Sequence, residues 1–152
     1  LMEAGAGLVL KTVDALARGD YKAIPQEELT AGNEIKHAPK IFKEDCKIDW
    51  NKPSETIRNL VRGLSPYPAA WSILKNIETG EEIQTKIFFT EKATRNQAEQ
   101  PGTITTDKKK TLLVACGEGW LKITDIQLAG KKRMKTEEFL RGFQQIENYR
   151  FI

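Results

Sequence analysis

Three consecutive cationic residues, Lys131, Lys132 and Arg133, directly follow Gly130 in the last third of the sequence. Glycine takes backbone angles that other residues avoid, so a tight turn is expected at this point. Cationic side chains on such a turn can hold phosphate groups, and each contact with a nucleic acid releases bound counterions. The sequence therefore predicts a phosphate-binding turn at these three residues.

Arg58 and Arg62 stand four residues apart within a predicted helix, so both lie on one face of it. One interpretation is that both point at a polyanion. The alternative is that they keep the helix soluble or pair with Glu55 and neighbouring acids. The sequence pattern leaves both interpretations open.

A third group of cations lies in an irregular stretch that contains Pro25 and Pro39. Its members are Lys36, His37, Lys40, Lys43 and Lys47. For a run of charges alone, the plain interpretation is a solvated connector. Lys40 and Lys43 are nevertheless candidate phosphate ligands, for a reason given with the family resemblance below.

Two further features have a structural explanation that we favour. The lysine run at 108–110 is typical of a soluble hairpin tip. Trp50, Trp71 and Trp120 have rings that can stack on unpaired bases, but their positions in strands or at a helix start favour packing in the core.

Sequence motifs for catalysis are missing. The chain contains no HExxH, GxSxG or P-loop pattern and no clustered set of His, Cys and Asp residues. His37 is the only histidine and has no paired Ser, Cys or carboxylate motif, so a surface position is favoured over a catalytic one. Cys46 and Cys116 fit neither zinc-type spacing nor a disulfide framework. We therefore predict no catalytic, cofactor-binding or metal-binding residue and favour an accessory anion-binding role.

Length and composition indicate one ordinary soluble domain with an appendage. The 152 residues are 39% hydrophobic and 30% charged, which is typical of globular proteins and not of disordered ones. A net charge of +3 is too small to establish nucleic-acid binding, so local clustering of cations must carry that argument. No apolar run is long enough to span a bilayer and no signal-peptide pattern is present, so we expect a cytoplasmic protein.

Five strands are predicted, at residues 70–76, 83–90, 102–106, 111–116 and 119–128, with hairpin turns between several of them. In the last strand the alternation of apolar and polar residues slips at Ile123, so a bend or bulge is expected there, with Asp125 on the wet side. Residues 91–101 are polar and predict a loop. Short strands linked by such turns favour a closed or partly closed antiparallel barrel.

Helices are predicted at both ends of this β region. Residues 1–18 form one, ended by Gly19, and residues 20–49 read as an extended linker. Residues 51–63 form another, capped by Asn51 and ended by Gly63 in a left-handed conformation. A short helix begins at Thr136, and the apolar tail after it is expected to lie on the domain.

Two long stretches carry a family resemblance. GEGWLKITDIQLAGKKRM followed by KTEEFLRG, and IDWNKPSETIRNLVRGLSPYPAAW upstream, resemble the C-terminal domain of methionyl-tRNA formyltransferase. The resemblance implies an α+β fold that is mainly β, with an OB-fold-like antiparallel barrel at 50–152, a linker at 20–49, and at 1–19 the closing helix of a missing catalytic domain. It also favours phosphate binding by Lys40 and Lys43, because the family's linker faces a positively charged channel for tRNA.

The same resemblance implies a function in translation initiation. The family transfers a formyl group from 10-formyltetrahydrofolate to the amino group of initiator methionyl-tRNA, and its Asn, His and Asp catalytic residues lie in the domain that this chain lacks. We thus expect a fragment that positions tRNA, is inactive alone, binds no cofactor itself and joins an N-terminal catalytic domain in a protein that is monomeric at full length and independent of membranes. The expected tRNA ligands are Lys40, Lys43, Arg58, Arg62, Lys131, Lys132 and Arg133.

Two alternatives remain. Related formyltransferases that act on sugar nucleotides or on formyl-folate carry a similar barrel, although the GKKRM turn favours tRNA. The barrel is otherwise a non-enzymatic domain that packs on a partner.

Overall fold

A computed structural model describes residues 1–30, 32, 34–35, 37–95, 97–143 and 145–152 of the chain. Two units are described separately, Leu1–Pro39 and Lys40–Ile152. The second unit begins ten residues before the predicted barrel domain, because Cys46 and Ile48 are buried in its core. The Ile48 N–H also donates to the Trp71 carbonyl at 2.8 Å. Residues 40–49, which their irregular pattern assigns to the linker, therefore pack with the barrel.

The first unit contains α1 (Met2–Arg18) and α2 (Gln26–Thr30). The predicted helix at 1–18 is confirmed, and Gly19 ends it in the left-handed conformation, with a φ of 70°. The sequence pattern does not predict α2, since five residues are too few to give a helical period. The apolar side chains of α1, Leu8 and Val13 among them, are exposed.

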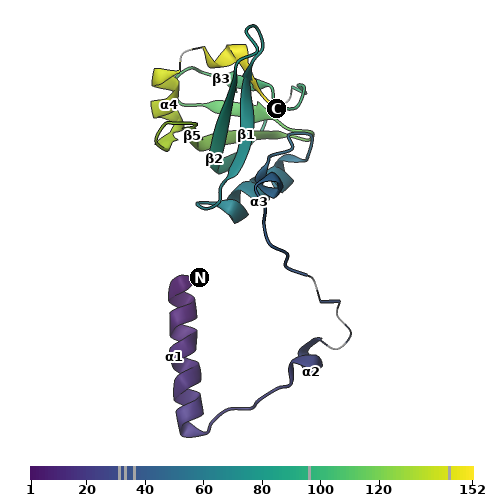
Figure 1. The fold of residues 1–152 in the computed structure, drawn as a ribbon, viewed down its shortest axis with the longest axis vertical. Coiled ribbons are helices and arrows are strands. Elements are labelled where there is room, and N and C mark those ends of the chain that lie inside the picture. The colour runs from purple at the N-terminus through teal and green to yellow at the C-terminus, as the bar shows by residue number, and fades with distance from the viewer. Residues whose placement is uncertain (31, 33, 36, 96, 144) are drawn as a thin grey trace. The chain divides into compact units, whose positions relative to one another are not determined.

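The second unit is a rolled antiparallel sheet with helices around it (Figure 1). The strand order is β3-β4-β5-β2-β1-β7, and β6 pairs with β5. The strand bounds are Ala70–Asn76 (β1), Glu82–Ala93 (β2), Ile104–Thr106 (β3), Leu112–Ala115 (β4), Trp120–Leu128 (β5), Met134–Lys135 (β6) and Tyr149–Phe151 (β7). Figure 1 shows β1 and β2 crossing the direction of β3 and β5, as a rolled sheet requires.

All five predicted strands are present, and the expectation of a mainly antiparallel barrel with flanking helices is confirmed. The predicted loop at 91–101 begins too early, because β2 continues to Ala93 and pairs there with Trp120. β6 and β7 are not predicted as strands, since two or three residues carry no alternation. The tail does lie on the domain, where β7 pairs with β1.

The two ends of the sheet meet at Gly102. The Phe151 N–H donates to the Gly102 carbonyl at 3.0 Å, and Thr103 and Arg150 form an antiparallel bridge. Gly102 has a φ of 87°, and a Cβ atom placed there would lie 2.0 Å from the Phe151 carbonyl oxygen. Only glycine fits this approach, which nearly closes the barrel.

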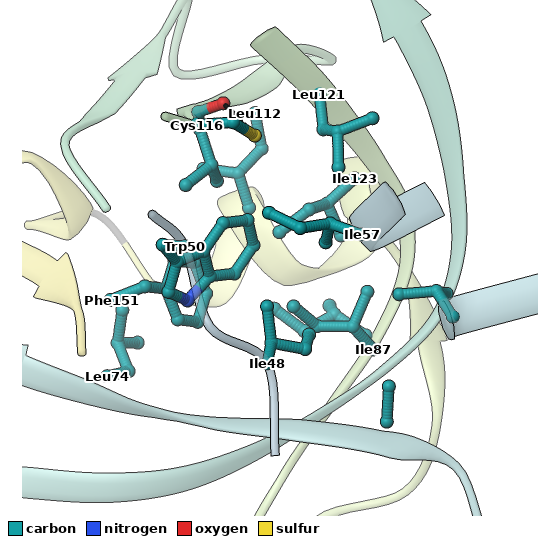
Figure 2. Close-up of a cluster of buried hydrophobic side chains, with 14 of the residues drawn as sticks. Ile48, Trp50, Ile57, Leu74, Ile87, Leu112, Cys116, Leu121, Ile123 and Phe151 are labelled. Carbon is teal, nitrogen blue, oxygen red and sulfur yellow. Dashed lines mark hydrogen bonds between the residues drawn. The ribbon is translucent and has the colours of Figure 1, made fainter. Parts of the chain in front are cut away.

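The barrel interior is a continuous apolar core (Figure 2). Trp50 packs on Phe151 with their ring centroids 5.2 Å apart, beside Ile48 and Leu74. The indole N–H of Trp50 donates to the Ser72 hydroxyl at 2.9 Å. That hydroxyl donates in turn to the Ile152 carbonyl at 2.9 Å, so the Trp50 indole N–H and the Ser72 hydroxyl both have partners.

α3 (Ser54–Leu64) buries Ile57, Val61 and Leu64 against the sheet. Both predicted caps of this helix are wrong. Asn51 does not cap it, because its backbone N–H and its side-chain amide both donate to Asp49 Oδ1. Gly63 lies inside the helix, which continues to Leu64 before Ser65 turns extended.

α4 (Thr136–Gly142) begins at the predicted residue and buries Phe139 and Leu140. The Thr136 hydroxyl donates to the Ile123 carbonyl at 2.6 Å, which ties the start of α4 to β5. Two short 3-10 helices, Glu44–Cys46 and Ile146–Asn148, complete the unit.

Candidate nucleic-acid interface

A row of three side chains crosses one face of the sheet. Trp71 of β1 pairs with Lys86 of β2, and Lys86 pairs with Gln127 of β5. Directly paired residues in adjacent strands point to the same face. With strands about 4.8 Å apart, the row covers about 10 Å and carries an aromatic ring, an ammonium group and an amide. We call it the Trp71 row.

The segment that precedes Trp50 supplies cations to one end of this row. The ammonium groups of Lys43 and Lys47 lie 5.6 and 5.8 Å from the centroid of the Trp71 ring. The Trp71 indole N–H donates to the Lys43 carbonyl at 2.8 Å, and Lys47 forms a parallel bridge with Trp71. Lys40 lies close by, 5.6 Å from the Phe42 ring centroid. Lys40 and Lys43 are therefore held by the barrel unit.

The turn after β5 supplies cations to the other end. Gly130 has a φ of 71°, an angle that other residues avoid, so the turn predicted at this glycine is confirmed. The Gln127 side-chain amide donates to the Lys131 carbonyl at 2.8 Å, and the Ala129 N–H donates to the Gln84 carbonyl at 2.9 Å. These bonds fix the turn to the face that carries the Trp71 row. Lys131 is exposed there.

Lys132 points toward α4. Its ammonium group lies 3.0 Å from the Glu138 carboxylate, and its side chain is 78% exposed. An exposed pair of this kind contributes little and exchanges readily with other partners. Lys132 thus remains available to a phosphate.

Arg133 is engaged by an acid. Its Nε and Nη2 donate to Asp125 Oδ1 at 3.1 and 2.9 Å, and Lys135 Nζ donates to Asp125 Oδ2 at 2.7 Å. The guanidinium carbon also lies 4.5 Å from the Phe88 ring centroid. Burial favours a higher pKa for Asp125, but the hydrogen bonds from Lys135 and Arg133 outweigh it and hold the pKa below its ordinary value. The arrangement makes Arg133 a brace for the turn.

Asp125 is not exposed to solvent as predicted, because its side chain is only 6% exposed. The pairing of β2 with β5 shifts twice, between Ile87 and Phe89 and between Phe89 and Thr90. The second shift leaves Thr124 unpaired, next to Ile123, so the bulge predicted there is confirmed. Asp125 pairs directly with the exposed residues Phe89 and Lys135, so it lies on the outer face of the sheet. Arg133 and Lys135 cover its carboxylate there, and their charges make its burial tolerable.

Arg58 and Arg62 lie on α3, outside the three strands that form the Trp71 row. Arg58 Nη1 lies 3.4 Å from Glu55, and Lys92 of β2 lies 2.9 Å from the same carboxylate. For Arg58 the structure thus matches the interpretation of an ion pair with Glu55. Arg62 is exposed on the same helix.

The three tryptophans and the remaining lysines occupy different environments. Trp50 and Trp120 are buried in the core, as expected, whereas Trp71 is half-buried. Lys36 lies outside the described residues. Lys47, Lys86 and Gln127 are members of the face that the sequence pattern does not single out. Lys86 is a single lysine in its strand, and the sequence does not indicate a binding role for it. Only the strand register shows that it lies between Trp71 and Gln127.

Among the described residues, no three His, Cys, Asp or Glu side chains gather in a way that could hold a metal ion. Burial raises the pKa of Cys116 to about 12, so its thiol is a poor nucleophile. Of the described helices, none is both long and apolar enough to cross a membrane.

Comparisons with known proteins agree with these features. The chain is 50% identical over 150 residues to methionyl-tRNA formyltransferase of Bacteroides fragilis and 47% identical to that of Bacteroides thetaiotaomicron. Each match covers 99% of this chain and 46% of the relative, so the chain spans about half the length of these curated relatives.

Solved structures of HypX from Aquifex aeolicus share the fold, with a TM-score of 0.63 and 22% identity over 90% of this chain and 23% of that one. Residues 40–144, which hold the Trp71 row and the basic turn, match the family model described as formyl transferase, C-terminal domain. That match covers most of the chain, which therefore belongs to the formyl transferase C-terminal domain family.

Proposed function

We propose that this chain is the tRNA-binding C-terminal part of a methionyl-tRNA formyltransferase. In this account the rest of the enzyme transfers formyl from 10-formyltetrahydrofolate to the amino group of initiator methionyl-tRNA. The part described here holds the tRNA and is inactive alone. The observation that carries the proposal is the gathering of cations from distant segments around the Trp71 row.

The proposed phosphate ligands follow from the contacts. Lys43, Lys86 and Lys131 are exposed, and Lys132 has only a weak surface partner. Lys40 and Lys47 extend the same face. Arg133 keeps the turn in place, and Arg58 and Arg62 form a second, separate contact on α3 for a substrate as large as tRNA.

Such a surface binds by charge and shape. Lysine contacts to phosphate fix the orientation of a nucleic acid without reading its sequence. Specificity for the initiator tRNA is therefore assigned to the rest of the enzyme. If about four phosphates are neutralised, log affinity falls against log salt with a slope of about −3 to −4.

The first unit fits a domain junction. The exposed apolar side chains of α1 need a cover that the described residues of this unit do not supply. We assign α1 to the end of the catalytic domain, as its closing helix, in a cytoplasmic enzyme that is monomeric at full length.

The direct test is filter binding of initiator tRNA to the 152-residue chain over a range of salt concentrations. Salt-dependent binding that weakens when Lys43 and Lys86 are changed to alanine supports the proposal. Binding that is absent, or that is unaffected by both changes, contradicts it and favours a barrel that only packs on a protein partner.

A further inference from the structure

An aromatic hollow lies beside the Trp71 row. It has a volume of about 320 Å³, and its walls include Ile41, Phe42, Lys43, Tyr67, Trp71 and Lys86. The Phe42 and Tyr67 side chains at its rim are 59% and 87% exposed. Single exposed apolar side chains are normal, whereas several that gather around one hollow mark an interaction site.

The walls of the hollow are held in place by the backbone. The Phe42 N–H donates to the Asp45 carboxylate oxygen Oδ2 at 2.7 Å. The Trp71 indole is tied to the Lys43 carbonyl. On the opposite wall, Ala69 has a φ of 73° and donates its N–H to the Leu64 carbonyl at 2.9 Å, which ties the loop that carries Tyr67 to the end of α3. A pocket fixed in advance loses little entropy when a ligand enters.

Charge distinguishes the possible occupants. Lys40 lies over the Phe42 ring, and Lys43 and Lys47 lie over the Trp71 ring. A protein partner with an apolar surface would gain nothing from the ammonium groups at the rim of the hollow, and burying these groups would carry a desolvation penalty. A nucleotide has a flat apolar base for the rings and an anionic phosphate for the lysines.

We propose that this hollow takes an unpaired base of the bound RNA, stacked against Tyr67 and Phe42, while the surrounding lysines hold its phosphates. The inference rests on the proposed function and adds a class of contact to it, because the phosphate contacts alone do not distinguish paired from unpaired RNA. Base stacking on an aromatic ring raises affinity by about fivefold or more for each base.

The experiment compares three RNAs by fluorescence anisotropy with the complete chain. One is a blunt duplex, one is the same duplex with a short 3′ adenosine overhang, and one carries an overhang of equal length built from abasic residues. The two overhangs bring equal numbers of phosphates. The inference predicts binding of the adenosine overhang about fivefold or more tighter than binding of the abasic one.

Variants assign that difference to the hollow. Tyr67→Ala and Phe42→Ala are expected to remove it while duplex binding persists. Tyr67→Phe keeps the ring, and Ile77→Ala removes a similarly exposed apolar side chain at the turn after β1, so both are expected to preserve it.

Equal binding of the two overhangs overturns the inference, and so does a preference that survives both alanine variants. In either case, salt-dependent binding of the blunt duplex leaves the proposed function standing. Absence of binding to all three RNAs refutes both.

Discussion

The Arg133 guanidinium donates two hydrogen bonds to one carboxylate oxygen of Asp125, at 3.1 and 2.9 Å. This pair divides the basic turn into two functions. Arg133 holds the turn to β5, whereas Lys131 is exposed at its tip. Of the three consecutive cations, Arg133 thus stabilises the turn, while Lys131 and Lys132 are the candidate phosphate ligands.

These two functions predict different effects of two alanine substitutions, one on stability and the other on tRNA binding. Arg133→Ala removes charge-assisted hydrogen bonds to a buried acid and should lower the free energy of unfolding by about 1–3 kcal/mol. Lys131→Ala should change stability by less than about 0.5 kcal/mol and reduce the salt slope of tRNA binding by about 0.7–0.9. Urea unfolding and filter binding measure the two quantities. Equal stabilities of the two variants would mean that Arg133 does not brace the turn.

Asp125 makes stability depend on pH in a defined direction. Its pKa is lowered in the folded chain, so the folded state binds this proton less readily than the unfolded state, whose aspartate pKa is about 3.9. The stabilisation is complete well above that value and is lost as pH falls through the lower, folded pKa. The unfolding free energies of the native chain and the Asp125→Asn variant should therefore converge between about pH 5 and pH 2.

The comparison with the variant is needed because Asp107 also has a lowered pKa in the folded chain and loses stabilisation on acidification. The backbone N–H groups of Thr111, Lys109 and Lys110 donate to its carboxylate and lower its pKa. Taking the difference between the two chains cancels that contribution. A difference that is constant from pH 7 to pH 2, or that grows on acidification, would exclude the proposed role of Asp125.

Closure of the barrel at Gly102 predicts intolerance of any side chain. Gly102→Ala forces an unfavourable φ and pushes a methyl group to within 2.0 Å of the Phe151 carbonyl oxygen. We expect a loss of more than about 2 kcal/mol, or no folded protein. Gly80→Ala is the matched control, with a φ of 76° and no atom within 4 Å of the added carbon, and should cost about 1–2 kcal/mol. Similar losses in both variants, measured by thermal unfolding, would argue against the closure.

The Ser72 hydroxyl links two parts of the core. Ser72→Ala leaves the Trp50 indole N–H without its acceptor, while the Ile152 carbonyl keeps the Ile73 N–H at 3.2 Å. We expect the unfolding free energy to fall by about 1–3 kcal/mol. Ser65→Ala is the control, since its buried hydroxyl oxygen has no hydrogen-bond partner, and we expect little change or a gain. Chemical denaturation measures the unfolding free energy of both variants. A larger decrease for Ser65→Ala than for Ser72→Ala would contradict the proposed role of the Ser72 hydroxyl.

The fold follows largely from local pattern. The stretches 70–76 and 119–128 alternate clearly, and their strands, β1 and β5, lie within one residue of the predicted limits. Prediction fails where a distant partner decides. β7 has only three residues and forms a strand because it pairs with β1. Asn51 does not cap α3 because its side-chain amide donates to Asp49.

The binding face follows from the sequence only in part. Runs of cations draw attention to Lys43 and Lys131, which do flank the Trp71 row. Lys86 stands alone in its strand and gains meaning from its neighbours in the register. The period-two count predicts an exposed Asp125 because it does not reveal that Arg133 and Lys135 cover this carboxylate.

The central claim is that cations around the Trp71 row bind the phosphates of tRNA. Two triple alanine variants test it at equal charge. One changes Lys43, Lys86 and Lys131, and the other changes Lys92, Lys108 and Lys122, each of which is paired with a glutamate away from that row.

The deciding measurement is the slope of log affinity against log salt for initiator tRNA in both variants. The account predicts that the first variant loses about 2–3 units of slope, at about 0.7–0.9 for each lost phosphate contact, while the second stays close to the native chain. Equal losses in the two variants would contradict the claim, because binding would then depend on net charge and not on this face.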